Sequence, residues 1–401
     1  MTELYYRAYQ FVVKRIMTRL PWREPLVVKG KGSLMELSRM IAAAHLKSVL
    51  VVTDEGISKS GLLDEFLHQL ETMGIRAHIY DDVHSNPTIK DAESAASLYK
   101  DMNCQGVVAF GGGSPIDCAK VAAVRVTKPN QSISKMRGIF KVRKNMPPFF
   151  VVPTTAGTGS ETTLAAVITN DGTDEKYALM DLSLIPHVAI LDPLLTIGLP
   201  EKVTAMTGMD ALTHAVEAYI GYGGTAETDK NAKEAAQLVF NNLYHSFNDG
   251  GDIEARSNMQ EAAYKAGFAF TRAFVGNVHA IAHTLGGFYN VPHGLANAVI
   301  MPYVLEYYSK LGVATYQLAE LADIVNITQS DDGDKEKARK FIIAIRELNA
   351  SMGIPEKISG IKDADIPHMI DNAHREANPL YPVPVIFGRA DFEKIYRMIK
   401  E

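Results

Sequence analysis

The first half of the chain alternates short apolar runs with segments of helix length, and this pattern constrains the fold most strongly. Five runs are rich in β-branched residues, at 25–30, 48–54, 76–82, 106–113 and 148–155. Helix-length patterns such as 33–47 and 61–74 separate the first four of them. Strands that are apolar along their whole length are typical of a parallel sheet with helices on both faces. The first half is therefore predicted to be an α/β domain built on a mostly parallel sheet.

The second half follows a different pattern. Strand signals largely stop after Pro200, and helical segments such as "DALTHAVEAY" and "KEAAQLVFNNLY" follow. We therefore expect an α/β domain over residues 1–200 and an all-helical domain over residues 201–401. A (β/α)-barrel is the competing fold, but it requires strands throughout the chain. Weaker strand signals at 164–169, 176–180 and 188–192 predict an extension of the sheet by antiparallel or mixed pairs.

Composition excludes several classes of function. The 401 residues carry a net charge of −5, which gives no general attraction to nucleic acid or to an anionic membrane. No apolar run approaches the roughly 20 residues that span a bilayer. Two cysteines, Cys104 and Cys118, argue against a disulfide framework and fit a reducing cytoplasm. The amphipathic start of the chain lacks the pattern of a signal peptide, and we expect it to form a helix that packs on the body or on a partner subunit.

A run of glycines follows the fourth apolar segment. In "GVVAFGGGSPIDCAK", Gly111, Gly112 and Gly113 stand between an apolar run and the start of a helix. Glycine lets the backbone turn tightly and approach a ligand closely. We expect Ser114 to cap this helix and Asp117 to complete a capping arrangement, so that the helix N-terminus faces a diphosphate. A tight turn without a ligand is the alternative, and three consecutive glycines favour anion binding.

A second loop of small and hydroxyl residues, "PTTAGTGSETT" (153–163), follows the next apolar run. Two such loops at the carboxyl ends of neighbouring strands favour one nucleotide in the crevice there. Asp54 ends another apolar run, where a carboxylate can bind ribose hydroxyls and repel a 2′-phosphate. That role would favour NAD over NADP, although an ordinary strand-end aspartate explains Asp54 equally well.

Histidines and one aspartate cluster in the helical half. Asp210 and His214 are four residues apart, as are His279 and His283, and His293 follows the turn-like "YNVP". A spacing of four places both side chains on one helix face. Buried without partners, these groups would be costly, and a divalent cation would satisfy them together. A mixed carboxylate and imidazole set suits Fe²⁺ or Zn²⁺ better than Mg²⁺ or Ca²⁺.

These motifs also occur together in a known family. "GGGSPID", "PTTAGTGSE", "DALTHAVEAY" and "VHAIAHTLGGFYNVPHGLANAVIMP" appear in order, with "NPT" at 86–88. From about Leu26 to its C-terminus, the chain resembles the iron-containing (group III) alcohol dehydrogenases. The resemblance implies a Rossmann-like dinucleotide-binding domain, an all-helical metal-binding domain, NAD and Fe²⁺ as cofactors, and a homodimer. NADP in place of NAD, and Zn²⁺ in place of Fe²⁺, remain open.

The resemblance also implies a role for each matched residue. It makes Asp210, His214, His279 and His293 the metal ligands, and His283 the catalytic residue that transfers a proton. Phe270 is expected to line the substrate pocket. The implied cofactor-binding residues are Asp54, Asn86, Gly111, Gly112, Gly113, Ser114, Asp117, Thr154, Thr155, Thr158, Ser160 and Lys176.

The expected activity is reversible hydride transfer between a small alcohol, or the corresponding aldehyde, and the nicotinamide. Activities like those of glycerol dehydrogenase or of a hydroxyacid–oxoacid transhydrogenase are alternatives on the same scaffold, as is a non-catalytic binding protein. Arg272 lies two residues after Phe270, where many relatives have small or amide residues. If Arg272 faced the pocket, a substrate with a carboxylate or phosphate would be favoured; we expect it to point away and to pair with a carboxylate.

Overall fold

The computed structural model describes residues 2–172 and 175–401. Contacts divide the chain into two compact units. The sheet unit runs from Trp22 to Gly198, and the helical unit combines Leu199–Glu401 with the N-terminal segment that ends at Pro21. Each unit has its own core and is described separately below.

Six strands form the main sheet of the sheet unit. They are β1 (Leu26–Lys29), β2 (Ser48–Val52), β3 (Arg76–Tyr80), β4 (Gly106–Gly111), β6 (Phe149–Pro153) and β9 (Val188–Leu191). Their order is β1-β9-β6-β4-β2-β3, and each neighbouring pair is parallel. The chain leaves β2 toward one edge and β4 toward the other, so the order reverses between these strands. Ligands of such sheets bind beyond the carboxyl ends of the strands at this reversal.

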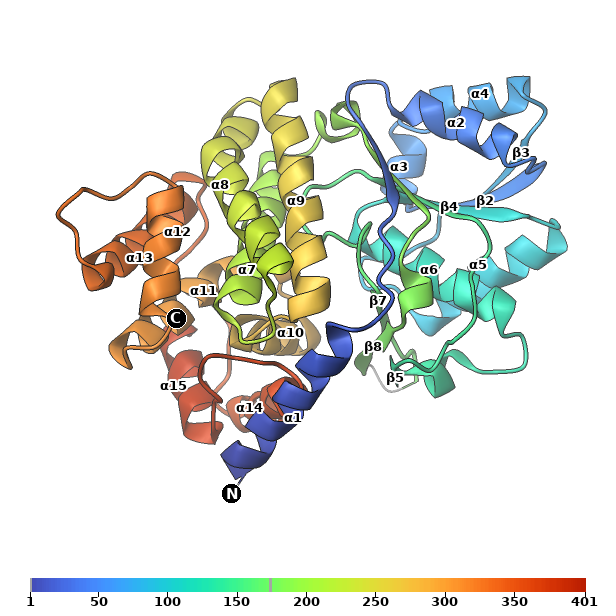
Figure 1. Ribbon diagram of the computed structural model, residues 1–401. Helices are drawn as coiled ribbons and strands as arrows, with labels where there is room; N and C mark the ends of the chain where they lie inside the picture. Colours follow the sequence, from blue (N-terminus) through green and yellow to red (C-terminus); the bar gives the residue numbers. More distant parts are fainter. Residues whose placement is uncertain (1, 173–174) are drawn as a thin grey trace. The chain divides into compact units, whose positions relative to one another are not determined.

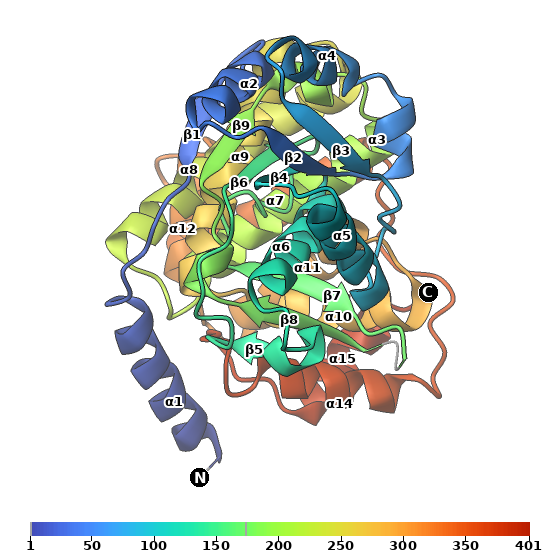
Figure 2. The same cartoon turned by 90° about the vertical axis from the view of Figure 1, so that its right-hand side faces the viewer.

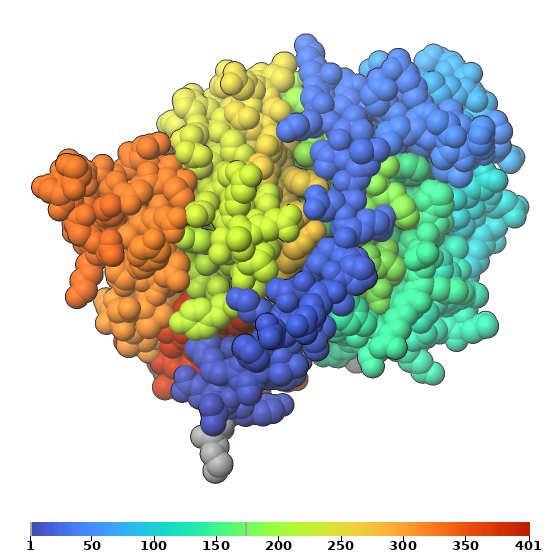
Figure 3. All heavy atoms as spheres, viewed as in Figure 1, coloured from blue at the N-terminus to red at the C-terminus, as the bar shows by residue number. Residues whose placement is uncertain are grey.

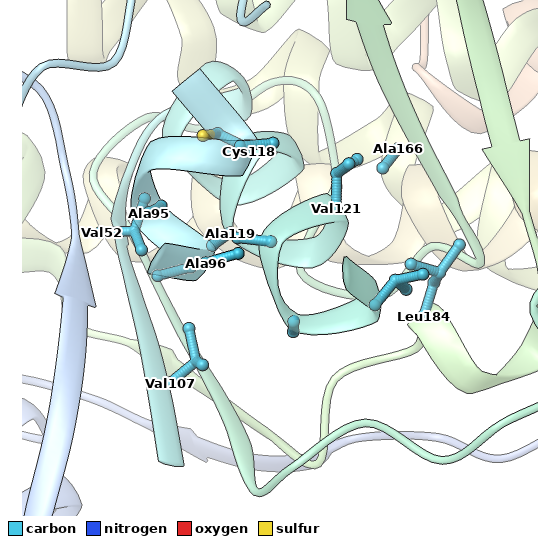
Figure 4. Packing of buried hydrophobic residues seen from close by; sticks show 14 of the residues in the cluster. Val52, Ala95, Ala96, Val107, Cys118, Ala119, Val121, Ala166 and Leu184 are labelled. Carbon is cyan, nitrogen blue, oxygen red and sulfur yellow. The ribbon is translucent and has the colours of Figure 1, made fainter. Parts of the chain in front are cut away.

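Helices cover both faces of the main sheet (Figure 1). The helices of this unit are α2 (Leu34–Ala43), α3 (Glu55–Lys59), α4 (Asp64–Thr72), α5 (Ile89–Asp101) and α6 (Gly113–Thr127). Side chains alternate across the strands, so Val51 packs with α2 and α4, whereas Val52 packs with α5 and α6. Figure 4 shows the second of these cores, where Val52 and Val107 meet the small side chains of α5 and α6. The prediction of a parallel sheet covered on both faces is confirmed.

The expected extension of this sheet is wrong for two of the three weaker strands. A separate sheet contains β5 (Gly138–Ile139), β8 (Lys176–Met180) and β7 (Ala165–Thr169), and the last two pair antiparallel (Figure 2). Along β7, buried and more exposed residues alternate, so that one face packs against the α6 core. β7 thus has one buried face, whereas β9 is buried along its whole length and lies between β1 and β6 in the main sheet.

Helices make up the other unit. They are α1 (Thr2–Met17), α7 (Glu201–Ile220), α8 (Ala226–Asn248), α9 (Ile253–Ala273), α10 (Asn277–Tyr289), α11 (His293–Lys310), α12 (Thr315–Ile324), α13 (Asp334–Ser351), α14 (Ile366–Ala377) and α15 (Arg389–Ile399). Every residue of α7 from Gly208 to Ile220 is buried, which makes α7 the central helix. None of the helices in the described ranges combines the length and apolar character needed to span a bilayer.

The N-terminal helix α1 belongs to the helical unit, although the sequence grouped residues 1–200 together. Arg7 donates to the carbonyls of Val383 and Pro384, at 2.6 and 2.9 Å, and Gln10 donates to the carbonyl of Tyr381 at 2.7 Å. These bonds attach α1 to a segment more than 370 residues away, which no local sequence pattern indicates. Figure 3 shows the dark-blue side chains of α1 at the molecular surface.

Candidate active site

Three helices bring the predicted metal ligands together in the helical unit. Asp210 and His214 lie one turn apart on α7, His279 lies in the first turn of α10, and His293 begins α11. One ligand-type atom from each of these four residues lies within 4.8 Å of the others. We call Asp210, His214, His279 and His293 the four-residue cluster.

A close contact between helices places His293 beside Asp210. A Cβ on Gly294 would lie 2.1 Å from the carbonyl oxygen of Met206 on α7, so glycine is required for α11 to approach this closely. As a result, His293 Nε2 lies 3.4 Å from Asp210 Oδ1. Gly294 thus permits the close packing of α11 on α7.

The charges of the cluster suit a cation. Asp210 is 2% exposed, and its carboxylate accepts a hydrogen bond from Asn297 Nδ2 at 2.8 Å. Burial, together with His214, His293 and His283, holds the pKa of His279 well below its usual value, so His279 stays neutral. A buried carboxylate beside the neutral His279 imidazole is an electron-rich site, and the donor set of one carboxylate and three imidazoles fits Fe²⁺ or Zn²⁺.

Glu217 orients His279. It lies two turns beyond Asp210 on α7 and accepts from the backbone N–H groups of Gly276 and Val278, at 2.8 and 2.7 Å. Its Oε2 also lies 2.6 Å from His279 Nδ1. Burial raises the pKa of Glu217 to about 7, while the backbone N–H groups act in the opposite direction. Glu217 therefore caps the start of α10 and leaves His279 Nε2 directed toward Asp210.

His283 adjoins the cluster and has a carboxylate partner of its own. Its ring stacks on His293 with 5.1 Å between centroids, and its Nδ1 lies 2.5 Å from Glu376 Oε1 on α14. The same oxygen accepts from the Tyr381 hydroxyl at 2.8 Å. Because the His283 side chain is 37% exposed, it can exchange protons with a bound molecule or with water.

Phe270 and Arg272 lie on different sides of α9. Phe270 stacks on His214, with 4.1 Å between ring centroids and a 15° interplanar angle, so it lies at the edge of the cluster. Arg272 is two residues further, about 200° around the helix. Its guanidinium lies 3.5 Å from the centroid of the Phe268 ring and donates to the Phe268 carbonyl. These contacts agree with the expectation that Arg272 points away from Phe270.

In the sheet unit, the glycine run forms the connection from β4 to α6. Gly111 has a φ of 149°, a conformation that favours glycine, and α6 begins at Gly113 with Gly112 as its N-cap. The predicted cap at Ser114 is therefore wrong. Ser114 lies in the first turn, and its hydroxyl donates to the carbonyl of Ser85 at 2.7 Å. Gly111 and Gly112 form the turn between β4 and α6. The helix therefore starts at Gly113, before the position that the predicted Ser114 cap would give.

The two predicted cofactor loops pack against each other. A Cβ on Gly113 would lie 2.8 Å from Thr158 Cγ2, and one on Gly112 would lie 3.3 Å from Thr155. Thr154 donates its N–H to the carbonyl of Gly111 at 3.0 Å. The glycines thus make room for the second loop as well as for any ligand.

Asp117 holds the second loop through hydrogen bonds. It accepts from the Ser160 hydroxyl at 3.1 Å and from the N–H of Val167 at 2.9 Å, in place of the expected capping bond. Lys120, one turn further along α6, is fully buried and donates to the carbonyls of Thr163 and Ala165.

The remaining predicted cofactor residues lie near strand ends of the sheet unit. Asp54 follows β2 and caps α3 by accepting from the N–H of Ile57 at 2.9 Å. Asn86 follows β3, and its Oδ1 accepts a hydrogen bond from Lys176 Nζ at 2.8 Å. These two predicted cofactor-binding residues are therefore adjacent. Because β2 and β4 are neighbouring parallel strands, Asp54 and the glycine run lie at the same edge of the sheet.

The sequence and fold match characterised proteins over most of the chain. Residues 25–193 match the family model for iron-containing alcohol dehydrogenase, and residues 204–399 match the C-terminal model of the same family. The chain is 39% identical to a 1,3-propanediol dehydrogenase of Klebsiella pneumoniae, over 83% of this chain and 86% of the relative. It is 35% identical to an NAD-dependent methanol dehydrogenase of Bacillus methanolicus, over 88% and 92%. The chain belongs to the iron-containing alcohol dehydrogenase family.

A solved structure supports the same assignment. The crystal structure of a 1,3-propanediol oxidoreductase superposes with a TM-score of 0.89 at 35% identity, covering 94% of this chain and 98% of that one. The expected family, its two-part fold and the enzyme class, an oxidoreductase acting on CH–OH groups, are therefore confirmed. Within this alcohol dehydrogenase fold, the individual residue roles remain predictions.

Three residues that surround the cluster were not identified from the sequence of this alcohol dehydrogenase, namely Glu217, Asn297 and Glu376. Glu217 follows Asp210 by seven residues and Asn297 follows His293 by four, so helical periodicity could have placed both on the cluster side of their helices. Glu376 lies 93 residues from His283, and no spacing rule links them.

Proposed function

We propose that this chain catalyses reversible hydride transfer between a small primary or secondary alcohol and NAD, with a divalent cation in the four-residue cluster. The observation that carries the proposal is the convergence of one carboxylate and three imidazoles within 4.8 Å in a member of this family. The cofactor would occupy the sheet unit at the carboxyl ends of β2, β4 and β6.

Asp210, His214, His279 and His293 would hold the cation, and Fe²⁺ is favoured over Zn²⁺ by the family. When bound, such a cation supplies Lewis-acid polarisation of an alcohol or carbonyl group. The protein contributes a ligand set that is already oriented: Asn297 holds Asp210, and Glu217 holds His279.

His283 is proposed as the catalytic residue that exchanges the alcohol proton with water. Its bond to Glu376 would keep Nδ1 protonated and leave Nε2 as the nitrogen that accepts and returns a proton. The partial exposure of the side chain gives the proton a route to solvent.

The cofactor proposal rests on the strand ends of the sheet unit. Gly111, Gly112, Gly113 and Ser114 would contact the diphosphate together with the N-terminus of α6. Thr154, Thr155, Thr158, Ser160 and Asp117 would form and support the second wall, with Asn86 and Lys176 toward a ribose. Asp54 would disfavour a 2′-phosphate, so NAD is proposed over NADP.

A neutral substrate fits the surroundings of the cluster. Phe270 presents an aromatic face beside His214, and Arg272 is folded onto Phe268. The relatives named for 1,3-propanediol and methanol make small alcohols and diols the first compounds to test. Glycerol dehydrogenase-like and transhydrogenase-like reactions would use the same residues and are distinguished by the same substrate screen.

We further propose a homodimer in the cytoplasm. Helix α1 is apolar on the face that does not contact the helical unit: Leu4 is 76% and Phe11 is 63% exposed. A helix with exposed large apolar side chains is suited to burial in an assembly. Both cysteines are free and buried, as a reducing compartment allows.

Metal analysis paired with an activity screen tests the function. The purified protein should contain close to one divalent cation per chain and reduce NAD with at least one alcohol in a panel that includes 1,3-propanediol, methanol, glycerol and hydroxy acids. Asp210→Ala and His279→Ala should lose cation and activity together. His368→Ala, which alters an exposed histidine on α14, should retain both. Full activity in a cation-free Asp210→Ala protein would refute the proposal.

A further inference from the structure

A buried asparagine contacts most of the four-residue cluster. Asn297 lies on α11, one turn beyond His293, and is fully buried. Its Nδ2 lies 2.8 Å from Asp210 Oδ1, 3.1 Å from His279 Nε2 and 3.1 Å from His293 Nε2. One amide nitrogen thus contacts three of the four ligand-type residues.

The neighbours determine which way this amide points. If the amide were reversed, its oxygen would lie 2.8 Å from the Asp210 carboxylate oxygen and the two would repel. Glu217 requires the same orientation, because a carboxylate that accepts from His279 Nδ1–H leaves an unprotonated Nε2. That nitrogen can accept a hydrogen bond but cannot donate one. The amide N–H₂ therefore faces the cluster.

Packing alone does not explain an asparagine here. Among the described residues, Asn297 Oδ1 is buried and has no hydrogen-bond partner, which is costly for an amide. The donors on the same side chain are directed at Asp210, itself 2% exposed. The carbonyl oxygen of the Asn297 amide is thus left without a hydrogen bond, while its N–H₂ group is directed at the predicted ligands.

We propose that Asn297 and Glu217 are positioning residues that set the geometry of the cluster before a cation binds. Glu217 fixes the tautomer of His279, so that Nε2 presents its lone pair. Asn297 holds the Asp210 carboxylate in place. Before a cation binds, its second N–H can donate to Nε2 of His279 or His293, and that bond is released when the nitrogen becomes a ligand. The bond from Asn297 to Asp210 does not use the histidine lone pairs and is therefore compatible with ligation. The inference rests on the proposed metal centre.

Co²⁺ binding to the metal-free full-length protein tests this proposal, because its visible absorption reports both affinity and coordination. Asn297→Ala and Glu217→Gln should each weaken Co²⁺ binding by about 10- to 100-fold, the usual effect of removing a residue that orients a ligand. Glu217→Gln can still accept from the backbone of α10. It offers an N–H₂ group to His279 Nδ1, however, and so favours the tautomer with a protonated Nε2.

Asn349→Ala is the matched control. Asn349 is also a buried amide, 7% exposed, and donates to the carbonyl of Ala298 without contacting the cluster. This variant should bind Co²⁺ with wild-type affinity and an unchanged spectrum. Circular dichroism of each metal-free protein establishes that it is folded; if Glu217→Gln is not, Asn297→Ala decides the test.

The outcomes separate the two proposals. If the wild-type protein binds no Co²⁺, the metal centre itself is refuted. If the wild-type protein binds Co²⁺ and the folded variants bind it with equal affinity and the same spectrum, the positioning role is overturned while the metal centre stands. Equal weakening in Asn349→Ala would also overturn it, because any buried amide would then have the same effect.

Discussion

At the scale of single residues, the chemistry depends on side chains that orient other side chains. His283 illustrates this, because its Nδ1 is held by Glu376, whose carboxylate also accepts from Tyr381. Burial and Glu376 hold the pKa of Tyr381 well above its usual value, so the hydroxyl remains a donor across ordinary assay conditions. The imidazole is thereby fixed in one orientation.

Replacing this carboxylate should impair proton exchange more than binding. Glu376→Gln keeps the shape of the side chain but weakens the partner of His283, and kcat should fall by about 10- to 100-fold with a much smaller change in KM. Steady-state kinetics of alcohol oxidation measure both constants. Tyr381→Phe, which retains the carboxylate, should have the milder effect; an unchanged kcat in Glu376→Gln would show that His283 needs no partner.

At the scale of elements, the cluster depends on the distance between α7 and α11. Gly294→Ala should push the two helices apart, because the added Cβ would meet the Met206 carbonyl at 2.1 Å. We expect a loss of about 1–3 kcal/mol in the free energy of unfolding, together with weaker cation binding.

Gly287→Ala in α10 is the control for this substitution. Nothing lies within 4 Å of a Cβ at Gly287, and alanine is the better helix former. This variant should be as stable as the wild type or slightly more so in thermal unfolding. If both glycine variants behave alike, the close contact between α7 and α11 does not limit the structure.

The second cofactor loop contains a buried acid, which gives a pH-dependent prediction. Burial raises the pKa of Glu161 to about 7 from an ordinary value of 4.5, with the backbone and Lys120 opposing the shift. The folded state therefore binds more protons than the unfolded state between these values. The contribution of Glu161 to the free energy of unfolding should decrease by up to about 3 kcal/mol as pH rises through that window.

Glu161→Gln removes this titration. Chemical denaturation at pH 5 and pH 7.5 should show wild-type stability falling relative to the variant as pH increases. A constant difference between the two proteins would mean that Glu161 titrates normally in the folded state.

At the scale of the whole molecule, the exposed face of α1 should decide the state of assembly. Phe11→Glu combined with Leu4→Glu places charges on two strongly exposed apolar positions and retains Arg7 and Gln10, whose bonds attach α1 to the helical unit. Light scattering should show a dimer for the wild type and a monomer for this variant. Met102→Glu, at an exposed apolar position in the sheet unit, should remain dimeric.

The sequence predicts what depends on local periodicity. Buried parallel strands are apolar along their length, so β2 and β4 are recognisable, and the i, i+4 spacing indicates the pair Asp210 and His214. Contacts between distant segments leave no such signal. The bond between Glu376 and His283 joins residues that are 93 positions apart in the sequence. The bond from Arg7 of α1 to Val383 joins residues that are 376 positions apart. Both contacts become visible only in the folded structure.

The start of α6 shows the limit at shorter range. Ser114 and Pro115 have the residue preferences of a cap and a first helical position, yet the helix starts at Gly113. Residue preferences are averages over many helices, whereas this helix start packs against the neighbouring loop, which leaves little room for a Cβ at 112 and less at 113.

The packing of Gly112 and Gly113 against Thr155 and Thr158 has an evolutionary consequence. A larger residue in the first loop would be tolerated only with a smaller partner in the second, so the two motifs cannot vary independently. Pairs of positions in contact are expected to co-vary among relatives. Laboratory selection for a different cofactor should therefore recover paired changes across both loops more often than single ones.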